Sequence, residues 1–210
     1  MKNLVLSIVA GMIIGIGGTI YLSNDIKLIG ALLFSFGLFF VLVYQFKLYT
    51  GLVGYMFENN TKKNLELGLI VIGNFIGTFI TGSLLRLTRV ADTLTLKAEA
   101  LVNIKLNDGI LSILILSFFC GLLMYLAVNT YYKAKTQDVK VIAIFISVVV
   151  FAVIGFEHSV ANMYYFTMAN IWTSKTFLYI LIMVIGNGLG SLFIPLINII
   201  TKKGEEIQTK

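Results

Sequence analysis

Glu157 and His158 stand out as residues that could do chemistry, because they form an ionisable pair between two uncharged stretches, 141–156 and 159–174. His158 is the single histidine of the chain. An imidazole with an ordinary pKa of about 6.5 changes charge near neutral pH, so it can donate a hydrogen bond to an anion or lend it a proton. A buried histidine bonded only to backbone is the alternative, and we favour the functional role. We expect Glu157 to face elsewhere and to support the local backbone.

The composition places these residues in a membrane. Of the 210 residues, 58% are hydrophobic and only 12% are charged, and the mean hydropathy is +0.93. Soluble domains carry about 25% charged residues, so an ordinary soluble enzyme, a nucleic-acid-binding module and a disordered chain are excluded. One cysteine, Cys120, and one histidine exclude an intrachain disulfide and a Cys- or His-rich metal site. We expect no metal and no other cofactor.

The uncharged stretches predict six membrane crossings. A helix needs about 20 apolar residues to cross the hydrocarbon. Five stretches reach or approach this length, namely 3–24, 28–46, 67–85, 109–132 and 176–201. The stretches 141–156 and 159–174 are each too short, and we interpret them as one span broken at Glu157 and His158. The first stretch is longer than the apolar core of a signal peptide, about 7–15 residues, and favours a retained helix. The sequence predicts one transmembrane domain over residues 1–210.

The loop lysines indicate the orientation of the spans. Nine lysines fall on the side that holds both termini, namely Lys2, Lys62, Lys63, Lys133, Lys135, Lys140, Lys202, Lys203 and Lys210. The short loops on the opposite side contribute only Lys27 and Lys175. By the positive-inside rule, both termini are predicted to be cytoplasmic in the plasma membrane. The region 92–107 alternates polar and apolar residues, which predicts a short amphipathic helix along the outer face.

An internal repeat relates the two halves of the chain. The pattern G-N-x-x-G-[ST] occurs at 73–78 and again at 186–191, three predicted spans later. An odd number of spans gives the halves opposite orientations in the bilayer. Inverted repeats, here approximately 1–85 and 105–203 joined by an outer connection 86–104, are typical of transporters and channels with a site near the midplane. Close packing of helices through small residues explains the same glycines, and both interpretations can hold together.

The predicted middle helix of each half is interrupted by polar residues. The interruptions are expected at 47–51 in the second span and at 155–162 in the fifth. Thr50 and Asn162 lie in these interruptions and have two open roles. Either side chain can cap backbone amides that lipid cannot satisfy, or it can line a path and exchange hydrogen bonds with a solute.

The string Phe156-Glu157-His158-Ser159-Val160-Ala161-Asn162-Met163 resembles the fifth-helix signature of the formate/nitrite transporter family. Leu48-Tyr49-Thr50-Gly51 is similar to its second-helix loop, and the two G-N-x-x-G repeats resemble parts of its third and sixth helices. The resemblance covers nearly the whole chain. It implies an all-α, aquaporin-like fold of six transmembrane helices in two inverted three-helix repeats, with broken second and fifth helices. It also implies a homopentamer whose protomers each carry a pore for a small monovalent anion such as formate, nitrite or hydrosulfide.

The resemblance also implies roles for particular residues. A central pore site would consist of Thr50, His158 and Asn162, and apolar constrictions would involve Phe34, Leu38, Leu48, Tyr49 and Phe151. Lys105 falls where family members carry a lysine that attracts anions. Three positions depart from the family pattern, namely Lys47 in a place that is often acidic, Tyr49 for phenylalanine and Gly121 where some members have asparagine. Because the first span starts the sequence without a preceding amphipathic helix, we expect the gating to differ.

Other functions fit the sequence less well. A true aquaporin is excluded because its paired Asn-Pro-Ala motifs need two prolines and the chain has only Pro195. A channel for small neutral solutes, or for weak acids in their neutral form, remains the alternative. An integral-membrane enzyme using Glu157 and His158 is more remote, because adjacent residues at a helix break rarely face one substrate. In the favoured mechanism the half-helix dipoles and Lys105 attract the anion, and His158 couples its passage to a proton.

Overall fold

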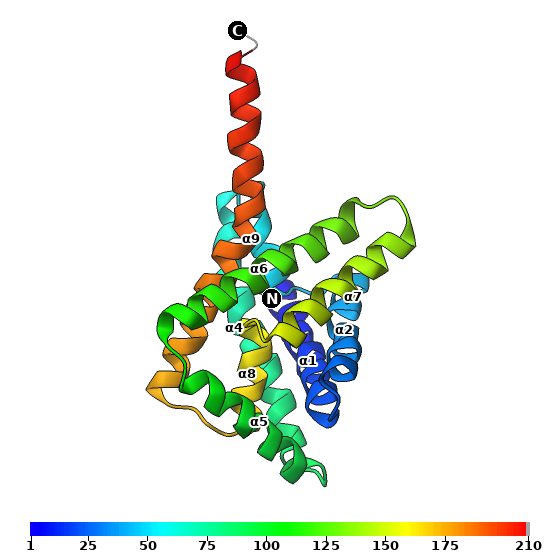
Figure 1. Ribbon diagram of the computed structural model, residues 1–210, viewed down its shortest axis with the longest axis vertical. Helices are drawn as coiled ribbons and strands as arrows, with labels where there is room; N and C mark the ends of the chain where they lie inside the picture. The colour runs from blue at the N-terminus through cyan, green and yellow to red at the C-terminus, as the bar shows by residue number, and fades with distance from the viewer. Residues whose placement is uncertain (209–210) are drawn as a thin grey trace.

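All regular structure in residues 1–208, which the computed structural model describes, is helical (Figure 1). Side-chain surroundings are described up to residue 201. The elements are α1 (Lys2–Ser23), α2 (Lys27–Val43), α3 (Tyr49–Leu52), the 3-10 turn η1 (Val53–Tyr55), α4 (Thr61–Leu85), α5 (Ala91–Leu106), α6 (Ile110–Lys133), α7 (Gln137–Ile154), α8 (Ser159–Met168) and α9 (Ser174–Gln208). The all-helical architecture expected from the sequence is confirmed.

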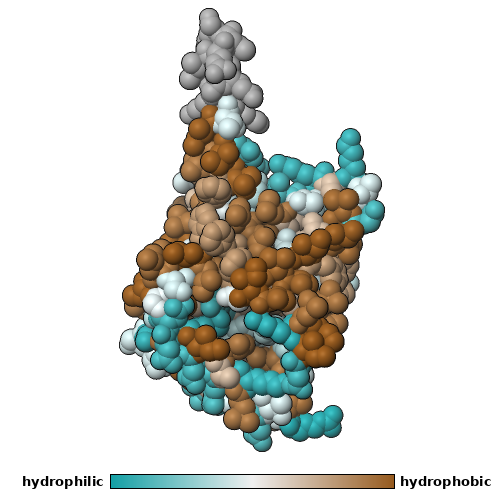
Figure 2. Space-filling view, in the orientation of Figure 1, coloured by the Kyte–Doolittle hydropathy of each residue, from teal (hydrophilic) through white to brown (hydrophobic). Residues whose placement is uncertain are grey.

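The outside of the helix bundle is apolar. Five helices are long and apolar enough to cross a membrane, namely α1, α4, α6, α7 and the Ser174–Thr201 part of α9. The apolar helix α2 is shorter, at 17 residues. Large side chains such as Leu33, Ile142 and Leu181 point outward from these helices. Figure 2 shows hydrophobic side chains across the middle of the visible face and hydrophilic ones around the α5 end. Such a surface suits hydrocarbon rather than water.

The chain leaves helical geometry twice, between α2 and α3 and between α7 and α8. The two breaks have the same backbone path. The amide of Phe46 donates to Val41 O at 2.9 Å, and the amide of Phe156 donates to Phe151 O at 2.9 Å. The residue before each of these amides has a positive φ, 57° at Gln45 and 93° at Gly155. The first break, 44–48, lies before most of the interruption expected at 47–51, and the second, 155–158, is shorter than the expected 155–162. Thr50 and Asn162 therefore lie within helices.

Two asparagines fasten the half-helices that follow the breaks. Asn74 on α4 accepts a hydrogen bond from the amide of Tyr49 at 2.9 Å and donates two of 2.8 Å, to Ser7 O and Lys47 O. The second half repeats this pattern with other residues. Asn187 on α9 accepts from the amide of Ser159 and donates to Ser117 O and Glu157 O, each at 2.8 Å. Each asparagine thus satisfies a backbone amide and a carbonyl that the break leaves unpaired, and it also binds a carbonyl of the intact helix α1 or α6.

The glycines of the G-N-x-x-G repeats let the helices approach closely. A Cβ atom at Gly77 would overlap Ile8 O, and one at Gly190 would overlap Phe118 O. As a result α4 packs tightly along α1, and α9 packs tightly along α6. The repeat therefore supplies both the contact between helices and the asparagine that holds the break.

A helix forms where the sequence predicts one at 92–107. α5 turns its buried residues Leu94, Ala98 and Val102 toward the bundle, at a spacing of four residues. It packs mainly against α8. The connection between the halves is therefore part of the bundle and covers the half-helix α8 on one side.

Replacing Asn187 with alanine is expected to lower the free energy of unfolding by about 2 kcal/mol or more, because the buried amide of Ser159 and the carbonyl of Glu157 lose their partner. Titration of the protein from a mild detergent into SDS measures the change. Asn198, which is exposed on the same helix, gives the matched control. An Asn187→Ala variant as stable as Asn198→Ala would contradict the fastening role.

Candidate functional site

His158 and Thr50, one from each broken helix, are in contact in the buried interior. Thr50 Oγ1 lies 3.0 Å from His158 Nε2. Their side chains belong to residues that are only 0% and 3% exposed. His158 directly precedes α8, and its Nδ1 accepts a hydrogen bond of 3.1 Å from the amide of Ala161. Since Nδ1 is the acceptor, the proton of the neutral ring sits on Nε2 and is donated to the Thr50 hydroxyl oxygen. The hydroxyl hydrogen of Thr50 is then available to a solute.

Two phenylalanines of the predicted constrictions lie beside this pair. The Phe151 ring stacks on the His158 ring with centroids 5.6 Å apart. Phe34 meets Phe151 edge-on at 5.9 Å, and Tyr21 lies 6.3 Å from Phe34. The rings of Tyr21, Phe34 and Phe151 form an aromatic cluster beside the His158–Thr50 contact.

Two leucines of the predicted constrictions line a narrow void, and His158 is not among the residues that line it. Leu38 and Leu48 are 3% and 2% exposed. With Val41, Leu42 and Val128 they line a void of only about 10 Å³. This is at the lower limit for one water molecule, so any ion crossing here would have to lose its hydration shell.

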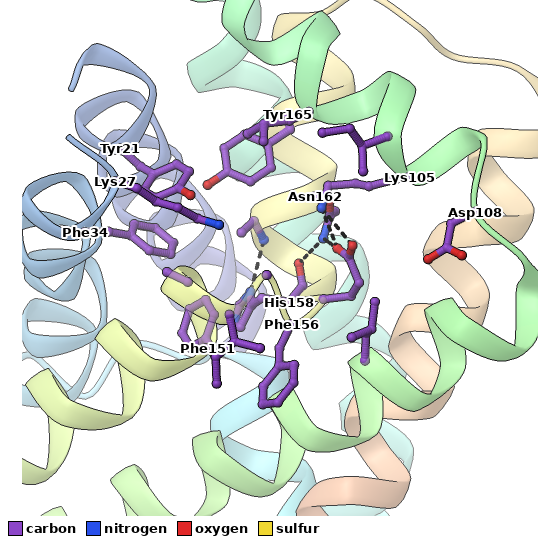
Figure 3. A pocket seen from close by; sticks show the side chains of 18 residues that line it. Tyr21, Lys27, Phe34, Lys105, Asp108, Phe151, Phe156, His158, Asn162 and Tyr165 are labelled. Atoms are coloured by element: carbon purple, nitrogen blue, oxygen red, sulfur yellow. Dashed lines mark hydrogen bonds and ion pairs between the residues drawn. The ribbon is translucent and has the colours of Figure 1, made fainter. Parts of the chain in front are cut away.

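A cavity of about 250 Å³ reaches His158 from the α5 side. Its wall combines the aromatic cluster with charged and polar groups, and the residues labelled in Figure 3 are Tyr21, Lys27, Phe34, Lys105, Asp108, Phe151, Phe156, His158, Asn162 and Tyr165. In Figure 3 the residues of α1 and α2 form one wall, and Lys105 and Asn162 lie on the other. The volume accommodates an anion of a few atoms together with several waters.

Lys105 and Glu157 form a buried ion pair in the wall of this cavity. Lys105 Nζ lies 2.7 and 2.8 Å from the two carboxylate oxygens of Glu157. Asn162 Nδ2 donates to Glu157 Oε2 at 2.8 Å and to His158 O at 2.9 Å. Asn162 therefore ties the break to α8 and does not cap an amide. Glu157 pairs with a neighbour at the break, as its expected supporting role requires. Lys105, which we expected to attract anions, has its charge largely compensated by Glu157.

Tyr49 does not lie in a constriction, contrary to expectation. Its hydroxyl donates to Val184 O on α9 at 3.0 Å. Its ring packs with Val53, Leu67 and Ile70, away from the His158–Thr50 contact. The physical reason is that Tyr49 is the first residue of α3, and the helix turns it toward α4 and α9 while it turns Thr50 inward.

Sequence reasoning missed the cavity residues Tyr21, Lys27 and Tyr165. Helical spacing was a usable signal for Tyr165, because His158, Ala161 and Tyr165 follow one another at three- and four-residue steps. In the sequence, Lys27 was used only as a loop charge that indicates the orientation of the spans. No sequence pattern identifies Tyr21 as a cavity residue. Among the described residues, no group of three or more His, Cys, Asp or Glu residues could hold a metal ion.

Comparison with known proteins identifies the family of this chain. The sequence profile described as "Formate/nitrite transporter" matches residues 1–200. This chain belongs to the formate/nitrite transporter family. It is accordingly a multi-pass membrane protein for transmembrane transport and not an enzyme.

Individual relatives agree with this assignment. The chain is 31% identical over 149 residues to the uncharacterized transporter YrhG of Bacillus subtilis (strain 168), an alignment that covers 66% of this chain and 56% of the relative. A pentameric formate channel with formate bound has a similar structure, with a TM-score of 0.79, 23% identity and 96% coverage of both chains. An FNT family ion channel matches with a TM-score of 0.78 and 19% identity, over 92% of this chain and 86% of the other. At these identities, the two structures establish a shared fold.

The Lys105–Glu157 pair is expected to behave as a coupled unit. Glu157→Gln or Lys105→Met alone leaves a buried charge without its partner and should cost about 3 kcal/mol of unfolding free energy. The double variant should cost less than the sum of the two by at least about 1 kcal/mol. SDS titration measures all three. The control is Asp25→Asn, which breaks the exposed Lys97–Asp25 pair and should change stability far less. Strict additivity at Lys105 and Glu157 would show that the pair contributes nothing.

Proposed function

We propose that this protein is a channel or transporter for small monovalent anions such as formate, nitrite or hydrosulfide. The observation that carries the proposal is the contact between Thr50 and His158. These two polar groups from opposite helix breaks lie between the aromatic cluster and the Leu38–Leu48 void, at the inner end of a cavity. A central polar point between two apolar narrowings suits a small solute that sheds its water in steps.

The pore would run through a single transmembrane domain over residues 1–210 with six crossings. The repeated hydrogen bonds of Asn74 and Asn187 support two inverted halves, approximately 1–85 and 105–203, with α5 in the connection. In this topology α2 with α3, and α7 with α8, each make one broken crossing. The lysine-rich loops would face the cytoplasm with both termini, and the α5 side would face outward across the plasma membrane.

We further propose that five copies assemble, each with its own pore. The structural likeness to a pentameric formate channel supports this assembly. The apolar exterior supports it too, because one exposed face could contact lipid and another a neighbouring copy. The site itself is complete within one chain, since Thr50, His158 and both sets of apolar residues come from the same protomer.

Passage would proceed from the cavity to the central pair and then past the leucines. An anion stripped of water in an apolar passage is costly unless hydrogen bonds or charge compensation replace the lost hydration. The Thr50 hydroxyl hydrogen and the His158 Nε2–H group are the donors nearest the centre. When both ring nitrogens carry a proton, His158 can also lend one to the anion, so that a neutral acid crosses Leu38 and Leu48 and the neutral ring remains. Asn162 and Glu157 hold the break that orients the ring, and Lys105 balances the charge of Glu157.

The second candidate function is passage of neutral solutes or of weak acids in neutral form. The tight apolar void at Leu38 and Leu48 favours an uncharged species over an ion. Conduction of a bare anion carries charge whereas passage of a neutral species does not, and electrical recording detects that difference.

In planar bilayers with a formate gradient, anion conduction is expected to give a current whose reversal potential follows the gradient. Joint passage of the anion with a proton gives no current but changes the pH inside loaded liposomes. Empty bilayers and liposomes are the controls. If neither current nor pH change is seen with formate, nitrite or hydrosulfide, the proposed function is wrong.

His158→Phe is expected to lower anion flux into proteoliposomes by about tenfold or more, the equivalent of one lost hydrogen bond to a charged group. The dependence of flux on pH between about 5 and 8 should weaken, because the titrating group is gone. Thr50→Val, which keeps the side-chain shape, should lower flux in the same direction.

The matched control is Tyr49→Phe, since Tyr49 is the neighbour of Thr50 and its hydroxyl faces α9. Its flux should stay close to that of the unaltered protein. Size-exclusion chromatography in detergent checks that each variant assembles. Unchanged flux and pH profile in well-assembled His158→Phe protein would remove the histidine from the mechanism.

A further inference from the structure

Four charged side chains line the cavity on the α5 side, and three of them are already engaged. Lys105 and Glu157 compensate each other at 2.7 Å. Asp108 accepts hydrogen bonds from the amide of Gly109 at 2.7 Å and from the Ser112 hydroxyl at 2.6 Å. It also lies just before α6, where the positive end of the helix dipole stabilises a carboxylate. The fourth charged group is Lys27.

Lys27 takes part in neither of the two ion pairs found within the described residues. It is the first residue of α2, where the helix dipole opposes a positive charge. The local helix therefore gives no reason for a lysine at this position. Lys27 is exposed, so its ammonium group is in contact with water.

The side chain of Lys27 reaches into the cavity rather than away from the protein. Figure 3 shows it beside Tyr21 and Phe34, on the wall opposite Lys105. Lys27 also lines a neighbouring cavity of about 280 Å³, which shares Tyr21, Leu101 and Ile104 with the first. The lysine thus lies where the two cavities adjoin, next to the aromatic cluster that precedes His158.

Building on the proposed passage of anions, we propose that Lys27 is a further residue that captures the anion. Its ammonium group concentrates small monovalent anions in the cavity before they meet Phe34 and Phe151. The four charges that line the cavity sum to zero, but Lys105 is paired with Glu157 and Asp108 is hydrogen-bonded at the start of α6. Lys27 is therefore the cation of this cavity without an ion pair among the described residues, and such a cation attracts small anions to its end of the cavity unless salt screens it. Lys27 is therefore a specificity residue for charged solutes, and it acts before the step at His158.

Chemical restoration of the charge tests this role in assembled protein. Lys27→Cys introduces one accessible thiol, because the only native cysteine, Cys120, is buried. A thiosulfonate reagent can attach either a quaternary ammonium or a sulfonate group to it. At low salt, formate uptake should fall roughly threefold or more on substitution, recover with the ammonium group and fall further with the sulfonate. At about 1 M salt, where the screening length is about 3 Å, the differences should largely vanish.

Lys175→Cys provides the matched control, because Lys175 is also exposed on the α5 side but donates to Leu106 O outside the cavity. Neither reagent should alter uptake in this variant or in the unaltered protein. Lys27→Arg should keep full uptake, and Lys27→Gln should raise the half-saturating formate concentration in a salt-dependent way.

The outcomes separate the two proposals. If the unaltered protein passes no anion, the proposed function fails. If it passes anions but Lys27→Gln and both labelled forms of Lys27→Cys match it at low salt, the function stands and the role of Lys27 is overturned. Equal losses with the ammonium and sulfonate groups would also overturn it, because they would reflect bulk and not charge.

Discussion

The structure depends on satisfying the backbone where two helices stop in apolar surroundings. Each break leaves amides and carbonyls that neither lipid nor apolar side chains can pair, at a cost of several kcal/mol per group. Asn74 and Asn187 meet this need from outside the broken helices, through one acceptor and two donor hydrogens each. The same side chains join each break to α1 or α6. The contact between Thr50 and His158, which we call the polar centre, is therefore held in place by the intact helices. The half-helices α3 and α8 supply or directly follow its two residues.

The two halves share this framework but differ in the residues at the breaks. Lys47 and Glu157 occupy equivalent places, since each offers its carbonyl to the fastening asparagine. Leu48 and His158 follow them. One half thus contributes an apolar side chain and the other an imidazole at the same structural position. The polar centre is one-sided, and only Thr50 from the first half contributes a polar side chain to it. This asymmetry allows a single hydrogen-bonding point between two apolar narrowings.

The sequence predicted the all-helical architecture, because long helices leave local signals. Long uncharged stretches mark the spans, and the repeated G-N-x-x-G pattern marks the helices that hold the breaks. The break boundaries were less accurate at Lys47–Gly51, since the turn at Gln45 has no glycine or proline to mark it. The place of Tyr49 in a constriction was implied by the family resemblance, and no local signal indicates that its side chain packs against α4 and α9.

The sequence also could not predict side-chain contacts between residues that are far apart in the chain. Lys105 and Glu157 are 52 residues apart, and neither residue type nor spacing indicates that they meet. Without this contact, Lys105 was expected to act as a free cation, and Lys27 was treated only as a topological marker. The motif residues Thr50 and His158 were placed together by family resemblance. Their contact depends on two breaks coming from different halves, which no local pattern can show.

The two turns also differ in conformational cost. Gly155 adopts its left-handed φ of 93° without a side chain to obstruct it, whereas Gln45 reaches 57° with a full side chain. For an L-residue other than glycine, this region costs on the order of 1 kcal/mol. The backbone is thus strained at the turn before Leu48 but not at the turn before His158. Of the two half-helices, the one bearing Thr50 therefore follows the more strained turn, and a change of backbone conformation at Gln45 would release strain that a change at Gly155 would not.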